Sequence, residues 1–328
     1  MKVALIGCGL IGRKRVEAFT ENISLAGVLD LDLDSARKLG TDFSAPIFES
    51  EDQIFSDSSI EAVFISTRHS NLAQLSEKAL RSGKNVFVEK PGALNYEELE
   101  QVARLAEKEN LRVHVGYNHR FHPAIQKAFE IFNSGLIGGP MFIRGRYGHG
   151  GRLGYEKEWR ANPKLSGGGE LIDQGTHLLD LSIGFLGELH LEYGATPTYY
   201  WGMPVEDNAF VSVANSNHNI AFLQASCTEW KNMFSFEVYC QKGKLDISGL
   251  GRSYGLETLT LHEMLPEMGP PKSTTWTFPG EDNSWKIEVD EFVDDLRTNS
   301  GKSNNLSEAL TVLRIIQDVY AGSSNDHN

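Results

Sequence analysis

The stretch that decides the fold lies at the amino terminus, where residues 2–12 read KVALIGCGLIG. A short apolar run typical of a buried strand is followed directly by Gly7, Gly9 and Gly12 in the GxGxxG spacing. In dinucleotide-binding folds the first glycine permits a tight turn, the second admits the pyrophosphate, and the third allows close helix packing. Free amides and the dipole of the following helix favour negative charge. The stretch therefore predicts a strand, a phosphate-binding turn and a helix.

Outward from this turn, apolar runs and helical patterns alternate to about residue 120. The runs are KVALIG, LAGVLD, EAVFIS, NVFVEK and RVHVGY, separated by stretches such as SNLAQLSEKALRSG and NYEELEQVARLAEKEN. This alternation predicts a parallel sheet with crossover helices, and the runs lack polar alternation because both sheet faces are covered. Gly83 is expected to end one helix, and Asn95 to cap the start of another. We therefore expect an α/β Rossmann domain that binds NAD over residues 1–120.

Asp30 indicates which dinucleotide is bound. It ends the second apolar run, eighteen residues after the last glycine of the turn. A carboxylate there can hydrogen-bond the adenosine ribose hydroxyls and repels a 2′-phosphate, which favours NAD over NADP. The alternative is that Asp30 only caps a turn, while Asp32 or Asp34 caps the next helix. Arg13 and Lys14 leave room for NADP, although such residues on a first helix more often face solvent.

After about residue 120 the pattern changes. A helix is expected from Pro123 to near Ser134, followed by the strand-like segments PMFIRGRYG, NAFVSVAN, IAFLQASC and FSFEVYCQ. Several of these alternate apolar and polar residues, which is typical of an antiparallel sheet with one wet face. Two closing helices, near 285–297 and 306–320, are expected to pack back on the body. Residues 121–328 are therefore predicted to form an α+β substrate-binding and oligomerisation domain with a large, mainly antiparallel open sheet.

The composition narrows the class of partner. A formal net charge of −13 repels nucleic acid and anionic membranes. Cys8, Cys227 and Cys240 are odd in number and lack metal-ligand spacing, so neither a disulfide framework nor a zinc site is indicated. The amino terminus does not read as a signal peptide, and no run reaches the roughly 18 apolar residues that span a bilayer. We expect a cytoplasmic protein that binds neither nucleic acid nor membrane.

Residues suited to acid–base chemistry stand at two places. Lys90 follows a strand that ends at Glu89, so it is expected at the carboxyl edge of the sheet, where α/β folds bind ligands. The alternative is a surface ion pair between these two residues. Asp173 and His177 are four residues apart and would project from one helix face, where a histidine can take a hydroxyl proton. Such a pair alone is more often a capping or core pair. No ligand cluster accompanies it, so no metal is expected.

Four ordered blocks together resemble the Gfo/Idh/MocA family of glucose-fructose oxidoreductase and inositol dehydrogenase. They are GCGLIG at 7–12, VEKPG at 88–92, GYNHRFHP at 116–123 and WRANPKLSGGGELIDQGTHLLD at 159–180, and the match spans essentially the whole chain. The resemblance implies that Lys90, Asp173 and His177 form the catalytic group beside the nicotinamide, with His177 as proton acceptor. Asp180, one turn further along, is expected to give structural support. It also implies a cis bond after Lys90, and open sheet faces that pair into homodimers or homotetramers.

The resemblance also implies a substrate pocket, to which a basic segment adds one residue. The predicted substrate-binding residues are Tyr117, Asn118, Arg120, Arg146, Trp159 and Arg160. The predicted cofactor-binding residues are Gly7, Gly9, Leu10, Ile11, Gly12, Asp30, Thr67, Arg68, His69, Glu89 and Lys90. The chain departs from the family between 67 and 72, where a proline, an asparagine and a histidine are usual. His69 is expected at the exposed edge of the site, packed near the cofactor. His119 and His122 are expected in pocket or structural roles rather than as metal ligands.

The basic segment RGRYGHGGRLGYEKEWR suggests a substrate class. Its cations are Arg144, Arg146, Arg152, Lys157 and Arg160. Guanidinium groups bind phosphate bidentately, so a sugar phosphate or nucleotide sugar is one hypothesis. The alternative is a solvated loop with ion pairs to Glu156 and Glu158. The glycines at 150, 151 and 154 would let this loop move as a lid.

The expected reaction is reversible hydride transfer between NAD and a hydroxyl-bearing carbon of a sugar. Two other classes stay open. One is a lyase or glycosidase-type enzyme that retains NAD and oxidises its substrate transiently. The other is a non-catalytic cofactor-binding sensor, which would be expected to lack Lys90 or His177.

Overall fold

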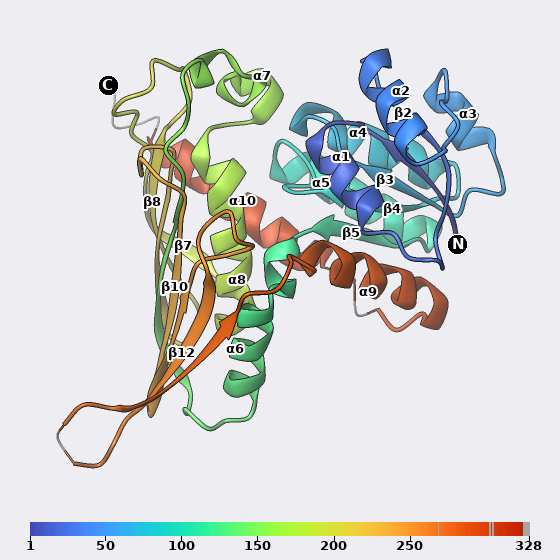
Figure 1. Cartoon of the computed structure of the whole chain (residues 1–328). Helices are drawn as coiled ribbons and strands as arrows, with labels where there is room; N and C mark the ends of the chain where they lie inside the picture. The colour runs from blue at the N-terminus through green and yellow to red at the C-terminus, as the bar shows by residue number, and fades with distance from the viewer. Residues whose placement is uncertain (268, 302, 304, 324–328) are drawn as a thin grey trace. The chain divides into compact units, whose positions relative to one another are not determined.

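The computed structural model describes residues 1–267, 269–301, 303 and 305–323. The chain divides into two compact units (Figure 1). The first comprises Met1–Tyr117 and Trp285–Leu310, and the second comprises Asn118–Ser284 and the residues from Thr311 onward.

The first unit contains a five-stranded sheet in which every neighbouring pair is parallel. The strands are β1 (Lys2–Ile6), β2 (Ser24–Leu29), β3 (Ala62–Ile65), β4 (Asn85–Glu89) and β5 (Val113–Gly116), in the order β2-β1-β3-β4-β5. A parallel bridge between Val28 and Ile47 extends the β2 edge. With that extension the order follows the 3-2-1-4-5-6 pattern of dinucleotide-binding folds. The predicted Rossmann fold is confirmed.

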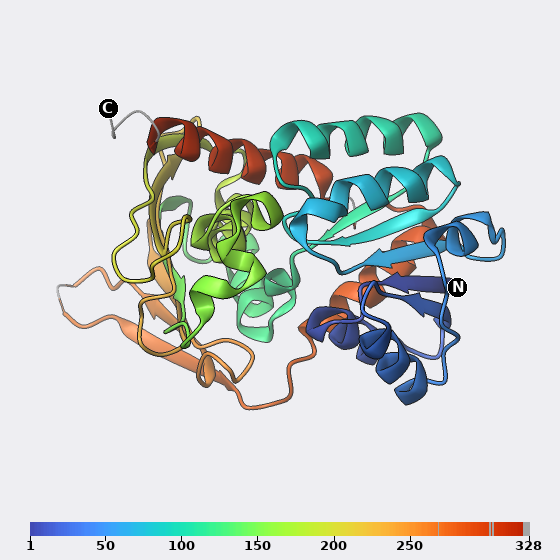
Figure 2. The same ribbon diagram turned by 90° about the horizontal axis from the view of Figure 1, so that it is seen from above.

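Helices cover both faces of this sheet, as Figure 2 shows. They are α1 (Leu10–Glu17), α2 (Leu33–Asp42), α3 (Glu51–Ser56), α4 (His69–Arg81), α5 (Tyr96–Glu109) and α9 (Ser284–Thr298). The Asn95 side chain accepts a hydrogen bond from the Glu98 amide at 2.9 Å and caps α5. Gly83, with φ of +73°, follows the end of α4. Both predicted helix ends are therefore confirmed.

Residues 285–310 belong to the first unit, although they lie far along the chain. Val289, Phe292 and Val293 on α9 share one buried core with Phe64 and Phe87 on the sheet. The rings of Phe64 and Phe87 stack 4.8 Å apart, and Phe292 meets both edge-on. The closing helix at 284–298 therefore completes the Rossmann core instead of extending the second unit.

The second unit is built on an eight-stranded sheet in the order β13-β12-β11-β10-β6-β9-β8-β7. The strands are β6 (Pro140–Gly148), β7 (His190–Ala195), β8 (Asn208–Ala214), β9 (Ile220–Ser226), β10 (Met233–Cys240), β11 (Gly243–Ser248), β12 (Glu257–Glu263) and β13 (Lys272–Phe278). Among these described strands only β6 and β9 pair in parallel. The predicted, mainly antiparallel sheet is confirmed.

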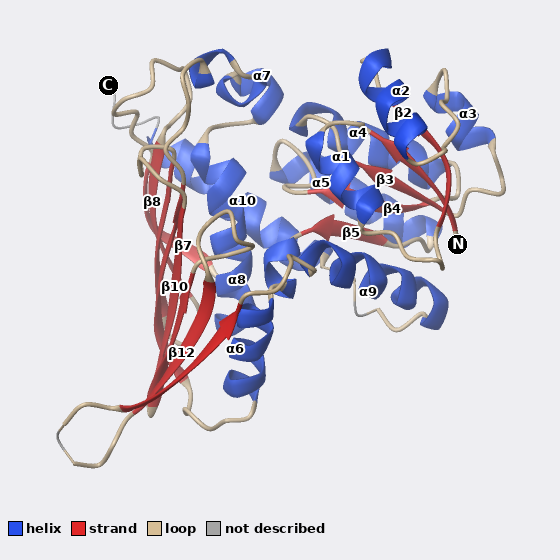
Figure 3. Cartoon of the chain, viewed as in Figure 1, coloured by secondary structure: helices blue, strands red, loops and turns tan. Residues whose placement is uncertain are grey.

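Helices cover one face of this sheet and leave the other face open (Figure 3). They include α6 (Pro123–Asn133), α7 (Pro163–Ser166), α8 (Thr176–Leu186) and α10 (Leu306–Ser323), the last of which begins in the first unit. A Cβ on Gly145 of β6 would lie 3.2 Å from Leu178 of α8, so Gly145 faces the helices. On the opposite face, Phe210 and Phe222 are exposed.

Candidate functional site

The glycine-rich turn after β1 has the geometry of a dinucleotide-binding loop. Gly7 has φ of +100°, and a Cβ there would lie 2.3 Å from the Ser66 carbonyl oxygen. A Cβ on Gly12 would lie 1.9 Å from the Gly7 carbonyl oxygen. A Cβ on Gly9 would meet nothing within 4 Å. Two glycines are therefore required by packing, whereas Gly9 leaves open space at the start of α1, where a pyrophosphate fits.

This difference gives a matched pair of variants. Gly9→Ala is expected to fold normally but to weaken NAD binding, because the methyl group occupies space that the pyrophosphate needs. Gly12→Ala is expected to destabilise the Rossmann unit itself, because its methyl group overlaps the Gly7 carbonyl. Calorimetric titration with NAD and thermal unfolding of both variants check this. Equal NAD affinity in Gly9→Ala and the wild type would contradict the assignment.

Asp30 lies directly after β2 and holds the turn. Its carboxylate accepts hydrogen bonds from the Cys8 amide at 2.6 Å and the Asp32 amide at 2.8 Å. Asp32 caps α2 by accepting from the Asp34 amide and the Ser35 hydroxyl. Asp30 therefore braces the turn, and its carboxylate keeps lone pairs for ribose hydroxyls. Burial and then the Asp30 charge raise the pKa of the Cys8 thiol to about 12, which agrees with a packing role.

The surroundings of the turn suit an adenosine ribose with a free 2′-hydroxyl better than one with a 2′-phosphate. Arg13 is paired with Asp42 at 2.5 Å, and the Lys14 ammonium lies 5.0 Å from the centre of the Trp285 ring. Two apolar side chains beside the turn are open to solvent: Leu10 is 71% exposed and Leu31 is 95% exposed. Leu31, which directly follows Asp30, was not singled out from the sequence.

The segment after β3 differs from expectation at one position. Thr67 is half-buried and Arg68 is exposed, as residues that flank a binding site can be. His69 was expected at an exposed edge, but it is only 4% exposed. It begins α4 on the same helical face as Leu72 and Ala73, which are both buried. The prediction of exposure is therefore wrong, because helix periodicity turns this ring inward.

Lys90 lies just beyond β4, half-buried, and its bond to Pro91 is cis, as the family resemblance implies. The alternative is that Lys90 only forms an ion pair with Glu89, but Glu89 already has Arg15 as a partner. The Glu89 carboxylate accepts a hydrogen bond from Arg15 at 2.5 Å. Burial raises the pKa of Glu89, and the Arg15 charge opposes that shift.

Arg15 extends this contact into a buried network of four charged or titratable groups. It also binds Glu288 of α9 at 2.5 Å, and its guanidinium lies 4.4 Å from the ring centres of both Phe87 and Trp285. The His114 Nε2 lies 3.0 Å from Glu288. Burial opposes ionisation of Glu288, but Arg15 and His114 outweigh it and lower its pKa. No local sequence motif announces this network.

In the second unit, Asp173 and His177 lie on consecutive helical segments. Residues Leu171–Gly175 form one π-helical turn, and Thr176 begins α8. Both side chains are buried, at 6% and 4% exposure. The spacing was predicted from a regular helix, so the π-helical turn is a local difference. Such turns occur often at functional sites.

The imidazole of His177 is packed against another histidine. The rings of His119 and His177 are stacked with centroids 3.7 Å apart and planes 16° apart. Tyr147 meets His119 edge-on at 5.0 Å, and it lies 6.1 Å from His177. His122 instead lies 3.1 Å from the Glu257 carboxylate. His119, from the GYNHRFHP block, therefore contacts His177, which its sequence position alone did not reveal.

Two arginines of the predicted substrate pocket are held by aspartates. Arg160 donates to Asp173 at 2.9 Å, and its guanidinium lies 4.7 Å from the centre of the Trp159 ring. The Asp173 charge is the main cause that raises the pKa of Arg160. Arg120 donates from Nε to the fully buried Asp180 at 2.7 Å. Asp180 thus supports Arg120, in agreement with its predicted structural role.

The two remaining pocket residues from the 116–123 block are buried. Tyr117, the last residue of the first unit's amino-terminal segment, has no exposed surface. Asn118 is 5% exposed and donates to the Ser284 hydroxyl at 3.0 Å. Lys90 lies in the first unit, whereas Asp173 and His177 lie in the second.

The prediction that Arg146 lines the substrate pocket is wrong. On β6, Gly145 and Tyr147 face the helices that carry His177, and strand side chains alternate. Arg146 is therefore on the open face of the sheet, where it is exposed. The basic segment does not form one patch, because Arg152 pairs with Glu158 at 2.6 Å, as the loop alternative expects.

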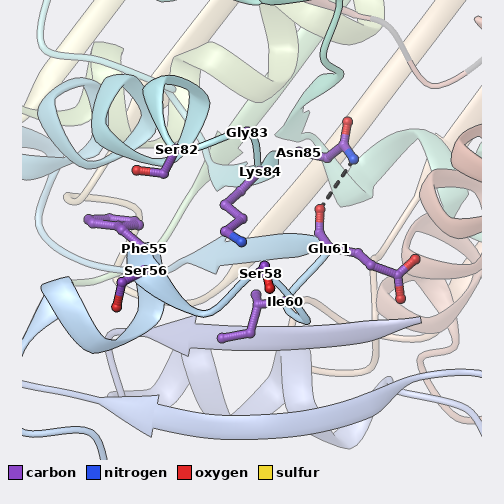
Figure 4. Close-up of a pocket in the computed structure, with 9 residues that line it drawn as sticks. All are labelled: Phe55, Ser56, Ser58, Ile60, Glu61, Ser82, Gly83, Lys84 and Asn85. Atoms are coloured by element: carbon purple, nitrogen blue, oxygen red, sulfur yellow. Dashed lines mark hydrogen bonds between the residues drawn. The ribbon is translucent and has the colours of Figure 1, made fainter.

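A cavity of about 500 Å³ lies elsewhere in the first unit (Figure 4). It is lined by Phe55, Ser56, Ser58, Ile60, Glu61, Ser82, Gly83, Lys84 and Asn85. These residues precede or begin β3 and β4, so the cavity is at the amino ends of the strands. Ligands of open α/β sheets bind at the carboxyl ends, so this cavity is not the cofactor site.

The described residues contain neither a metal-binding cluster nor a membrane-spanning helix. No group of three or more His, Cys, Asp or Glu side chains there is arranged to hold a metal ion. No helix in the same residues is long and apolar enough to cross a membrane.

The comparisons with known proteins identify the family. Residues 1–117 match the oxidoreductase family with an NAD-binding Rossmann fold, and residues 125–246 match the GFO/IDH/MocA C-terminal domain. The chain belongs to the Gfo/Idh/MocA oxidoreductase family, and its first unit is that family's NAD-binding domain.

Individual relatives are more distant. An oxidoreductase from Formosa agariphila is 31% identical over 56% of this chain and 60% of its own length. Glucose-6-phosphate 3-dehydrogenase from Bacillus subtilis is 28% identical over 55% of this chain and 52% of its own. The matched region thus spans about half the length of such curated relatives. The solved structure of levoglucosan dehydrogenase with NADH and levoglucosan has a TM-score of 0.89 at 19% identity and covers 99% and 97% of the two chains.

Proposed function

We propose that this protein is an NAD(H)-dependent oxidoreductase that transfers a hydride to or from a hydroxyl-bearing carbon of a sugar. The observation that carries the proposal is the buried pair Asp173 and His177, held by Arg160 and by the stacked His119 ring. A buried histidine four residues from a buried carboxylate, on consecutive helical segments, is suited to general acid–base chemistry. The names of the similar proteins, which refer to glucose 6-phosphate and levoglucosan, support a sugar hydroxyl as the reacting group.

Each residue has a separate role in the proposed reaction. The glycine turn and Asp30 would hold NAD, which would supply the hydride acceptor or donor. His177 takes the hydroxyl proton as the C–H bond breaks, so that the alcohol becomes a ketone and one proton is released. Asp173 orients His177 or the substrate, and Lys90 stabilises the oxygen as negative charge develops on it.

The experiment is a screen of free sugars, sugar phosphates and nucleotide sugars with NAD and with NADP. Reduced nicotinamide is followed by absorbance, and product is quantified separately. We expect one NADH per product with one substrate class, and NAD preferred over NADP because of Asp30. No turnover with any of the three classes would contradict the proposal.

The same screen separates two further possibilities. Product without net NADH would indicate transient oxidation by a retained NAD, as in a lyase or glycosidase-type enzyme. A phosphorylated sugar is the finer hypothesis from the basic segment. It is weakened by the pairing of Arg152 and by the position of Arg146, and preference for the free sugar over its phosphate would exclude it.

We further propose that the protein is a cytoplasmic homo-oligomer that pairs through its open sheet face. Phe222 on β9 is 57% exposed and Tyr193 on β7 is 63% exposed, and both lie on described strands of that sheet. Exposed apolar patches of this kind often mark protein–protein contacts. The molar mass in solution tests the assembly.

A further inference from the structure

Three carboxylates lie close together near the start of α8, and they are not equally compensated. Asp173 receives the guanidinium of Arg160. Glu206 accepts hydrogen bonds from the Gly169 and Leu171 amides at 2.9 and 3.0 Å. It also accepts one from the Tyr320 hydroxyl at 2.8 Å. The third carboxyl group, Glu170, is 1% exposed.

Glu170 has weaker partners than the other two. Its Oε1 accepts a hydrogen bond from the Tyr155 hydroxyl at 2.8 Å, and His149 Nε2 lies 3.7 Å away. Its Oε2 is buried and meets no hydrogen-bond donor at normal distance and angle in the described part of the chain. The Cys227 thiol, a weak donor, is another polar group that faces this carboxyl group. Burial lowers the pKa of His149, and the Asp173 charge opposes this shift without cancelling it, so this imidazole is mainly neutral at pH 7.

An ionised carboxylate in this position would lower the stability of the folded protein. A buried charge without a cation costs several kcal/mol, whereas a neutral carboxyl costs far less. Ionised Glu170 would also repel Asp173. Physical chemistry therefore favours a proton on Glu170, and a protonated carboxyl still accepts the Tyr155 hydrogen bond.

We propose that Glu170 works in its neutral, proton-bearing form as a positioning residue. It holds Tyr155, and through Tyr155 the 149–160 segment, beside Asp173 without adding a second negative charge there. This inference deepens the proposed function, because it rests on Asp173 being part of the reaction. Glu170 itself is not assigned contact with substrate.

The neighbours of Glu170 determine the pH at which it loses its proton. Burial and then the Asp173 charge raise the pKa of Glu170 from 4.5 to about 8. Burial also raises the pKa of Tyr155 and Cys227, so neither loses its proton near pH 8. Burial raises the pKa of Glu206 as well, against its hydrogen-bond donors. Arg160 stays charged beside Asp173, because its pKa is raised.

The folding stability depends on pH because the pKa of Glu170 is higher in the folded than in the unfolded state. The stability that Glu170 contributes is fully present below its unfolded pKa near 4.5 and is lost as pH rises to about 8. Glu170→Gln removes this dependence. The difference in melting temperature between variant and wild type is therefore expected to change between these two pH values and to be constant above them.

The test uses Glu170→Gln, which keeps the shape and neutrality of the side chain. We expect kcat/KM at pH 7 to stay within about threefold of wild type, since one neutral group replaces another. Above about pH 8 the wild type is expected to lose activity as Glu170 ionises, with a limiting slope of about tenfold per pH unit, and the variant to lack this decline. Glu192→Gln, on β7 with a side chain 48% exposed, is the matched control and should follow the wild type.

A second readout does not depend on activity. Infrared difference spectra against pH should show a protonated carboxyl in the wild type at pH 7 that is absent in Glu170→Gln. Without that band, or with an unchanged alkaline decline in the variant, the inference is overturned. If no sugar is oxidised at all, the proposed function fails, while the infrared and melting data still decide the protonation of Glu170.

Tyr155→Phe keeps the inference testable if Glu170→Gln does not fold. The Tyr155 hydrogen bond lowers the pKa of Glu170, so its removal should move the alkaline decline and the infrared titration to higher pH. A shift to lower pH, or no shift, would contradict the role given to Glu170.

Discussion

Replacing His177 by asparagine is expected to lower kcat/KM for sugar oxidation by about 10²–10⁴-fold, the usual contribution of a general acid–base. Asparagine keeps a planar polar group against the His119 ring but cannot take the hydroxyl proton. Steady-state kinetics with the substrate found in the screen measure the loss. NAD affinity is expected to be unchanged, because the glycine turn and Asp30 lie in the other unit.

The control is His190→Asn, whose ring lies on β7 with a side chain 58% exposed. It should retain full activity. An unchanged kcat/KM in His177→Asn would contradict the proposed mechanism, whereas equal losses in both variants would point to general destabilisation of the second unit.

Replacing Arg15 by methionine is expected to destabilise the first unit by about 3–5 kcal/mol, because it leaves buried carboxylates without their cation. Arg15 has no exposed surface and binds both Glu89 and Glu288 at 2.5 Å. Methionine replaces the apolar stem, so the loss reports mainly on charge. Urea unfolding, with hydrogen exchange of the amides in β4 and α1 as the probe, measures the loss of stability. The enzymatic activity should also fall, because Lys90 directly follows β4 and loses its fixed position when that strand is destabilised.

The matched control is Arg37→Met on α2, whose side chain is 66% exposed in a surface pair with Asp34 and should change stability little. The double variant Arg15→Met with Glu288→Gln should recover part of the loss, since it removes one uncompensated charge. A loss in Arg15→Met below about 1 kcal/mol would show that the network is not a stabilising element.

Predictions that rest on neighbouring residues were the successful ones. The glycine turn, the five strands of the first unit and the cap at Asn95 depend on contacts within a few positions. Asp30 braces the turn from a position that the same motif specifies. The prediction that Asp173 and His177 project toward one site rested on a regular helix, whereas the structure has one π-helical turn at Leu171–Gly175.

Predictions of where a side chain points failed at two positions, because one step along a strand or helix moves a side chain to another face of that element. Arg146 has the composition of a phosphate ligand, but it alternates with Gly145 and Tyr147 on β6 and therefore faces away from α8. His69 reads as an exposed polar residue, but α4 places it in line with Leu72.

The amino-acid sequence by itself determined the Rossmann fold, the NAD-binding turn and the residue types available for acid–base chemistry, because local periodicity and glycine conformation carry that information. Only the tertiary structure decided which polar groups share a buried space. Arg15 and Glu288 are 273 positions apart, and Glu170 meets Tyr155 from a different segment. Their charge states depend on desolvation and on partners brought together by folding, and no local pattern encodes those quantities.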